Sequence, residues 1–255
     1  MSLLECKQVE IGINNRLLLP AFDWHIESGS CWGILGANGC GKSTLLKSVA
    51  GLLPLLGGNL KINAIEPGKV KTKELARSVG MLPQETPFRF PAYVLDLVLA
   101  GRYPWQTWYS RLSDKDKIIA SESLKKIGAE ELSGRLANRL SGGEARKVAM
   151  AILLCQSPGL ALLDEPENHL DPGMRYHLID RLKEHFTCDG KALAMVLHDP
   201  TLALHFCSHL LLIEADGSVS AGPVDTMATE EKLSAVYGHG MRITQDSGRR
   251  LVYPE

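Results

Sequence analysis

A glycine-rich stretch near the N-terminus has the residue types and spacing that bind a chain of phosphates. It follows the pattern G-x-x-x-x-G-K-S and comprises Gly36, Ala37, Asn38, Gly39, Cys40, Gly41, Lys42, Ser43 and Thr44. Glycines let backbone N–H groups approach an anion closely, the lysine can reach the β- and γ-phosphates, and the serine hydroxyl can ligate Mg²⁺. The alternative, a chance glycine-rich helix cap, is disfavoured by the strand pattern before the stretch and the helix pattern after it. The stretch therefore predicts a site for ATP and Mg²⁺, without saying what the ATP is used for.

Two adjacent carboxylates supply the acidic groups that such a site needs. Asp164 and Glu165 follow the apolar run at 160–163, which reads as a buried strand. Parallel-sheet proteins place ligand-binding groups at strand ends. Asp164 is suited to holding Mg²⁺ through a water, and Glu165 to polarising an attacking water as a general base. Taken alone, such a pair is more often a strand end followed by a solvated turn; the phosphate-binding stretch reverses that preference.

A second candidate anion site lies at Ser141, Gly142, Gly143 and Glu144. The serine and the glutamate have the S-x-x-E spacing of a capping box, and residues 145–154 can form the helix that it caps. A helix N-terminus with two glycines can bind an anion. From these residues alone, however, a well-capped helix is the more common explanation.

Short apolar runs alternate with helical patterns along the chain. We expect a helix over 42–50, which Gly51 can end, and buried strands at 31–35, 160–163, 192–197 and 210–213. Strands that alternate with helices in this way predict an α/β fold with a mostly parallel sheet. Between about Pro91 and Gln156 helical patterns replace strand patterns, which indicates a helical subdomain inserted into the sheet domain.

The composition excludes several classes of protein. Lys and Arg number 28 against 29 Asp and Glu, so the net charge of −1 lacks the positive field of a nucleic-acid binder. The six cysteines form no C-x-x-C pair, which disfavours a zinc knuckle or a disulfide framework. No apolar run approaches the ~20 residues that span a bilayer, so we expect a soluble chain unless a partner holds it at a membrane.

Taken together and in order, these motifs resemble the nucleotide-binding subunit of an ABC transporter. The resemblance rests on residues 36–44, Gln84, 140–144, 162–166, 168–171 and His198. It implies a P-loop NTPase (RecA-like) fold with a mostly parallel sheet core, an inserted α-helical subdomain and an N-terminal antiparallel β portion. It further implies a single ABC ATPase domain over 1–255, the helical subdomain at 91–156 carrying the signature motif, and a short C-terminal tail at 222–255, which is strand-like after Tyr237-Gly238.

The resemblance also implies a shared site and assigns roles. Two copies would face each other head to tail, with each ATP held by residues 36–44 of one chain and by Ser141, Gly142, Gly143 and Glu144 of the other. Gln84 would touch Mg²⁺ and the attacking water, and His198 would contact the γ-phosphate; a lone strand-end histidine is otherwise usually structural.

The chain departs from the family pattern in three places. Glu144 replaces the usual glutamine, Asn168-His169-Leu170 precedes Asp171, and no aromatic ring stands near Ile13, where adenine usually stacks. Base selectivity is therefore left open, and no adenine-stacking residue is named.

The expected partners are transmembrane permease subunits and, indirectly, an extracytoplasmic solute-binding protein, at the cytoplasmic face of the inner membrane. Residues 101–105 and Tyr237-Gly238 are similar to ATPases of importers for iron–siderophore, haem and cobalamin complexes. Trp105, Trp108 and Tyr109 could dock the permease or simply pack locally. The alternatives are an importer of another solute, a soluble ABC ATPase with a non-transport role, and an inactive scaffold.

Overall fold

A six-stranded sheet forms the centre of the computed structural model, which describes residues 1–85, 88–107, 112–168, 170–246 and 248–255. Its strands lie in the order β5 (Val79–Leu82), β6 (Leu160–Asp164), β7 (Ala192–Val196), β3 (Cys31–Gly36), β8 (His209–Ile213) and β9 (Val219–Pro223). β9 pairs antiparallel with β8, and the other described neighbours pair in parallel. The expected strands and the mostly parallel sheet are confirmed.

The parallel strands are mostly apolar and buried, because helices or a second sheet cover both faces. Every residue of β3, β6 and β7 is buried. Ile34 and Asp164 both pair with Val196, on opposite sides of β7. This register brings the carboxyl ends of β3 and β6 to one edge of the sheet, where the glycine-rich turn and the two carboxylates follow.

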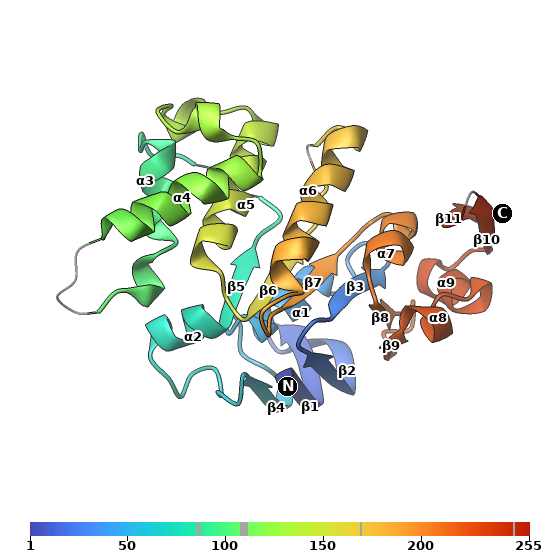
Figure 1. The fold of residues 1–255 in the computed structure, drawn as a ribbon. Helices are drawn as coiled ribbons and strands as arrows, with labels where there is room; N and C mark the ends of the chain where they lie inside the picture. The colour runs from blue at the N-terminus through green and yellow to red at the C-terminus, as the bar shows by residue number, and fades with distance from the viewer. Residues whose placement is uncertain (86–87, 108–111, 169, 247) are drawn as a thin grey trace.

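The N-terminal strands form the expected antiparallel portion, at the bottom of Figure 1. Its order is β2 (Arg16–Glu27), β1 (Ser2–Ile13) and β4 (Gly57–Ile62). Trp24 and Ile26 pack in one apolar core with Leu45 and Leu46 of α1 (Lys42–Val49). The antiparallel sheet thereby holds α1, and with it the end of the glycine-rich turn, against the central sheet.

Helices fill the chain between β5 and β6 and gather at the upper left of Figure 1. The helices α3 (Val94–Ala100), α4 (Asp114–Lys126) and α5 (Gly142–Gln156) pack against one another. The helix α2 (Thr72–Ser78) precedes β5, and three single turns lie between the longer helices: η1 (Tyr103–Trp105), η2 (Glu130–Leu132) and η3 (Ala137–Arg139). Val98, Leu124 and Val148 share a buried cluster with Leu163 of β6, so these helices join the core of the sheet.

The remaining helices follow β6 and end in a compact C-terminal segment. α6 (Pro172–Phe186) and α7 (Pro200–Phe206) lie on either side of β7 in sequence. After β9 come α8 (Val224–Met227), α9 (Glu230–Tyr237) and the hairpin of β10 (Met241–Asp246) with β11 (Arg249–Pro254). The tail therefore begins with two short helices, and the hairpin is the predicted strand-like part after Gly238. The buried side chains of Leu233 and Val236 anchor α9 in the core. In the described ranges, none of the helices is both long and apolar enough to cross a bilayer.

Candidate nucleotide site

The glycine-rich turn joins β3 to α1 in a conformation that only glycine adopts readily. Gly39 has a φ of 80° and Gly41 a φ of 107°, in the left-handed region, and a Cβ on Gly39 would meet nothing within 4 Å. Gly41 is the N-cap of α1 and has no side chain to cap it, so the first N–H groups of the helix remain available for an anion. The turn has the geometry of a phosphate cradle.

Lys42 begins α1 and folds its side chain back across the turn. Its Nζ donates hydrogen bonds to the carbonyl oxygens of Gly36 at 2.8 Å and Ala37 at 2.9 Å. The ammonium is thus oriented by neutral carbonyl groups toward the turn, where it can bind an incoming anion. Ser43, the next residue, donates from Oγ to Oδ1 of Asp164 at 3.0 Å. The hydroxyl and the carboxylate that the sequence assigned to Mg²⁺ therefore lie side by side.

Glu165 is the centre of a cluster of polar side chains. Its Oε2 accepts hydrogen bonds from Nε2 of Gln84 at 2.6 Å and from Nδ2 of Asn168 at 2.5 Å, and its Oε1 lies 2.6 Å from Nε2 of His198. The backbone of Glu165 has a φ of 51°, which costs energy in a residue other than glycine. Such strain is retained where the surrounding contacts determine the conformation, and here they aim the carboxylate at Gln84 and His198.

Two further carboxyl groups beside Glu165 are buried. Burial raises the pKa of Asp164, and the charge of Glu165 adds to this while the bond from Ser43 opposes it. Burial also raises the pKa of Glu167, whose Oε1 accepts a hydrogen bond from the backbone N–H of His198 at 2.8 Å. A site that crowds this much negative charge favours the approach of a cation.

The side chains and the turn enclose a cleft of about 380 Å³, within the range of small-molecule sites. It is lined by Leu18, Asn38, Gly39, Gly41, Lys42, Ser43, Thr44, Gln84, Glu165 and His198. Backbone N–H groups and Lys42 suit a phosphate chain. The oxygen atoms of Ser43, Asp164 and Gln84 suit Mg²⁺, which prefers oxygen ligands and takes the rest from phosphates and water. The donor set fits both ATP and Mg²⁺.

The second predicted anion site lies apart from the residues that line this cleft. Ser141 is the N-cap of α5; its Oγ accepts from the N–H of Glu144 at 3.3 Å, and Glu144 Oε2 accepts from the N–H of Ser141 at 2.8 Å. The predicted capping box is confirmed. These two bonds and Arg135, whose Nη1 lies 2.6 Å from Glu144 Oε1, hold the pKa of Glu144 below its usual range. Ser141 and Gly142 are exposed, so an ATP bound there would have to come from outside this chain's own cleft.

Three residues that the sequence reasoning did not assign to the site contact it. Asn168 bonds Glu165, Glu167 bonds the backbone of His198, and Arg146 bonds the carbonyls of Asp164 and Glu165. A signal for Arg146 was available, because it stands on the apolar stripe that Met150, Leu153 and Leu154 continue along the helix.

His169 lies outside the described residues. Ile13 is 45% exposed at the end of β1, and the apolar side chain that borders the cleft is Leu18.

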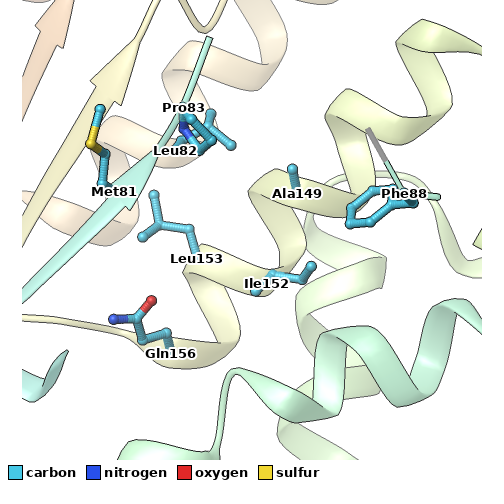
Figure 2. Close-up of a pocket in the computed structure, with 8 residues that line it drawn as sticks. All are labelled: Met81, Leu82, Pro83, Phe88, Ala149, Ile152, Leu153 and Gln156. Atoms are coloured by element: carbon cyan, nitrogen blue, oxygen red, sulfur yellow. The ribbon is translucent and has the colours of Figure 1, made fainter. Parts of the chain in front are cut away.

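A second hollow lies between β5 and α5 and is almost entirely apolar. Figure 2 shows Leu82 of β5 and Ala149, Ile152 and Leu153 of α5 around it, while the side chain of Met81 packs on the other face of the sheet. The hollow holds about 200 Å³ and is also lined by Pro83, Phe88 and Gln156. Trp105 lies beside it and donates from Nε1 to the carbonyl of Gln156 at 2.6 Å, while its side chain stays 41% exposed. Trp108 and Tyr109, named with it from the sequence, lie outside the described residues.

Comparisons with known proteins identify the family. The model of the ABC transporter family matches residues 19–168. The chain is 31% identical to the achromobactin transport ATP-binding protein of Dickeya dadantii, over 96% of this chain and 91% of that protein. It is 30% identical to the ferric enterobactin transport ATP-binding protein of Escherichia coli, over 98% of this chain and 93% of that protein.

Solved structures agree in fold. A metal-chelate type ABC transporter in an inward-facing conformation superposes with a TM-score of 0.83 at 23% identity, covering 99% of this chain and 96% of that one. An ATP-binding cassette captured as a dimer after hydrolysis, with ADP and Pi bound, gives 0.74 at 25% identity, covering 87% and 98%. With its phosphate cradle, its strand-end carboxylates and these relatives, the chain belongs to the ABC transporter family, as a subunit that binds and hydrolyses ATP.

Proposed function

We propose that two copies of this chain hydrolyse Mg²⁺–ATP in shared sites and thereby drive an importer from the cytoplasmic face of the cell membrane. The observation that carries the proposal is the separation of two anion sites on one chain. Lys42, Ser43, Asp164 and Glu165 meet at the cleft, whereas the capped glycines at the start of α5, Gly142 exposed and Gly143 half-buried, do not line it. A head-to-tail pair would complete each site. A structurally similar cassette is a dimer with ADP and Pi.

Within each site, the side chains would divide the work of hydrolysis. Lys42 and the N–H groups of the turn bind the phosphates, while Ser43 and Asp164, with Gln84, would hold Mg²⁺. That ion neutralises charge on the phosphates during transfer. Glu165 takes a proton from the attacking water, and Gln84 and His198, both bonded to its carboxylate, orient water and γ-phosphate around it. Ser141, Gly142, Gly143 and Glu144 of the partner would close the site.

The relatives support an iron chelate as the imported solute, and they also define the alternative. Relatives of 30–31% identity are named for transport of achromobactin and ferric enterobactin. A phosphonates import ATP-binding protein of Trichormus variabilis is 33% identical, over 89% of this chain and 96% of that protein. Near-equal identities leave import of another solute as the second candidate. An iron–siderophore complex is favoured because the iron-chelate relatives align over more of this chain.

The apolar hollow between β5 and α5 is the proposed seat of the permease. Exposed Trp105, which donates to the carbonyl of the lining residue Gln156, borders it, and aromatic side chains are enriched where interfaces gain their energy. It also adjoins Pro83, the residue before Gln84, so a permease seated there would touch the segment that bonds Glu165. An extracytoplasmic solute-binding protein would reach this chain only through the permease.

Mixed dimers test the shared site. A Lys42→Ala chain spoils its own cradle, whereas a Ser141→Arg chain spoils the site of its partner. Each variant alone forms homodimers with two defective sites, but a mixed dimer carries both lesions in one site and leaves the other intact. Adding Glu165→Gln to both chains stops turnover, so that ATP-dependent dimerisation is the readout. Mixing should recover a nucleotide-dependent dimer that neither variant forms alone.

Controls test the alternative, in which each ATP is held within a single chain. A single-chain site predicts no recovery, because each chain then carries its lesion in its own site. Counting ATP per mixed dimer distinguishes this result from a dimer that needs two occupied sites. A Ser113→Arg chain is the matched control for Ser141→Arg, because Ser113 also caps a helix through a capping box but lies on α4. It should form the dimer as the parent does.

Growth assays test the solute. Deleting the gene should abolish growth when an iron–siderophore complex is the sole iron source and leave growth on a phosphonate as the sole phosphorus source unchanged. Complementation with the parent chain should restore growth, and the Lys42→Ala chain should not. The opposite pattern would assign the chain to phosphonate import while leaving the shared ATP site standing.

A further inference from the structure

Arg146 is a buried cation on the helix that begins at the signature glycines. It stands in the second turn of α5 and is only 1% exposed. A buried arginine is rare unless it is paired, because removing its charge from water is costly. No carboxylate oxygen of the described residues forms an ion pair with it. Packing alone does not explain a charge here, since an apolar side chain would fill the space at lower cost.

The guanidinium is bonded instead to backbone carbonyls of two loops. Nη1 donates to Pro83 at 2.5 Å and Gln84 at 3.2 Å. Nη2 donates to Asp164 and Glu165, both at 2.7 Å, and Nε donates to Pro166 at 3.4 Å. These loops follow β5 and β6, which are neighbours in the sheet. Only a planar fork with several donors reaches so many acceptors, whereas a lysine offers a single point charge.

Charge balance comes from the carboxylates around the fork. Burial lowers the pKa of Arg146 to about 10, and the negative charges of Glu167, Asp164 and Glu165 oppose that shift. The group therefore remains a cation near neutral pH. A cation centred among three carboxyl groups, yet bonded to the carbonyls of the loops, fixes the backbone and leaves the carboxylate oxygens free for other partners.

The two loops carry the residues whose side chains meet at the cleft. Gln84 Nε2 donates to Glu165 Oε2 at 2.6 Å, and Arg146 holds the carbonyls of these same two residues from behind. Glu165 also has the left-handed φ of 51°, a conformation that needs outside support. We propose that Arg146 is a positioning residue, whose fork holds Gln84 and Glu165 in register and so makes the geometry of the base depend on the placement of α5.

This inference rests on the proposed role of Glu165 as the base, and double variants separate the two. In the purified full chain, Arg146→Met should lower kcat by about 10–100-fold, the scale of misplacing a reactive group by about 1 Å, with KM for ATP changed less than threefold. Rates are expressed per chain that binds ATP, so that a loss of folded protein does not lower the measured kcat. The Arg146→Met/Glu165→Gln variant should be no slower than Glu165→Gln, because Arg146 acts through Glu165.

Two further readouts exclude a merely structural role. Hydrogen exchange should quicken at the amides of Gln84, Glu85, Asp164 and Glu165 in Arg146→Met, while the amides of β7 stay protected. Arg146→Lys keeps the charge, is expected to fold, and should remain at least tenfold below the parent, because one ammonium cannot hold both loops. The matched control is Arg102→Met, which removes another partly buried arginine that donates to a carbonyl of α5, that of Cys155 at 3.0 Å. It should lower stability but leave kcat within twofold.

Multiplicative losses in the double variant, full activity in Arg146→Lys, or unchanged exchange at both loops would each overturn the inference. If Glu165→Gln alone hydrolysed ATP as fast as the parent, the assignment of Glu165 as the base would be wrong. That result differs from those that would contradict the positioning role of Arg146.

Discussion

Gln84 donates a hydrogen bond from Nε2 to Oε2 of Glu165 at 2.6 Å, across 81 residues of sequence. The two residues follow neighbouring parallel strands, β5 and β6, whose carboxyl ends share one edge of the sheet. Asn168 and His198 contact the same carboxylate. The carboxylate is therefore oriented by three side chains, so that under the proposed mechanism an incoming water would meet a base that is already in position.

Replacing that base tests the role directly. Glu165→Gln keeps the size of the side chain but cannot accept a proton, so hydrolysis should slow by about 10²–10⁴-fold. Binding of Mg²⁺–ATP should stay nearly intact, because Lys42 and the turn are untouched. Phosphate release and binding of a fluorescent nucleotide measure the two effects. Glu122→Gln, an exposed position on α4, is the control. Turnover within threefold of the parent would remove Glu165 from the role.

Local patterns in the sequence predicted the parts of the fold that local physics decides. The apolar runs of β3, β6 and β7, the S-x-x-E capping box of α5 and the glycine turn before α1 each depend on neighbouring residues. Asp164 and Glu165 could be placed at a strand end for the same reason. These features need no knowledge of distant contacts, which is why the α/β class and the approximate limits of the elements were predictable.

Contacts between distant segments were beyond this reasoning. Arg146 reads as one charge in a helix, and only the packed structure brings it to the carbonyls of Pro83 and Glu165. The contact of Glu167 with the site was likewise not predictable, because its partner is the backbone N–H of His198, 31 residues away. The two short helices of the C-terminal tail, α8 and α9, were not predicted, because so few turns carry little periodic signal; α9 is held in the core by Leu233 and Val236. In each case the deciding interaction joins elements whose spacing in sequence carries no signal.

The glutamate at the end of the signature should be nearly equivalent to glutamine. The carboxylate of Glu144 accepts hydrogen bonds from the N–H of Ser141 and from Arg135, so its negative charge is partly neutralised at the helix cap. Glutamine can make the same bond to Ser141, and the partly exposed pair with Arg135 contributes only about 0.2–1 kcal/mol. Glu144→Gln should therefore change kcat and KM for ATP by less than about fivefold. Glu144→Ala, which removes the reciprocal cap, is the comparison, and a tenfold effect of Gln alone would contradict this account.

A half-buried histidine should make stability depend on pH. Burial, with Lys191 and Lys126 nearby, lowers the pKa of His185 to about 4, below the 6.5 expected when unfolded, while Asp189 opposes the shift. The unfolded chain then binds the extra proton first, so this contribution is complete above pH 6.5 and is lost as the pH falls from 6.5 towards 4. After allowance for partial exposure, we expect a loss of about 1–2 kcal/mol. Urea unfolding at several pH values should show a smaller loss in His185→Gln than in the parent or in exposed His177→Gln.

The cysteine inside the phosphate cradle should make the enzyme sensitive to alkylation. Cys40 is half-buried and its Sγ lies beneath the turn, where a Cβ on Gly36 would come within 2.6 Å of it. A maleimide group there would displace the turn and abolish ATP binding. ATP that holds the turn closed should protect, slowing inactivation by about 100-fold at 100 times its dissociation constant. The assay uses EDTA to prevent turnover and a Cys188→Ser chain, since Cys188 is exposed and would react without consequence. Cys40→Ala should resist the reagent; inactivation as fast as the parent would show that another cysteine is responsible.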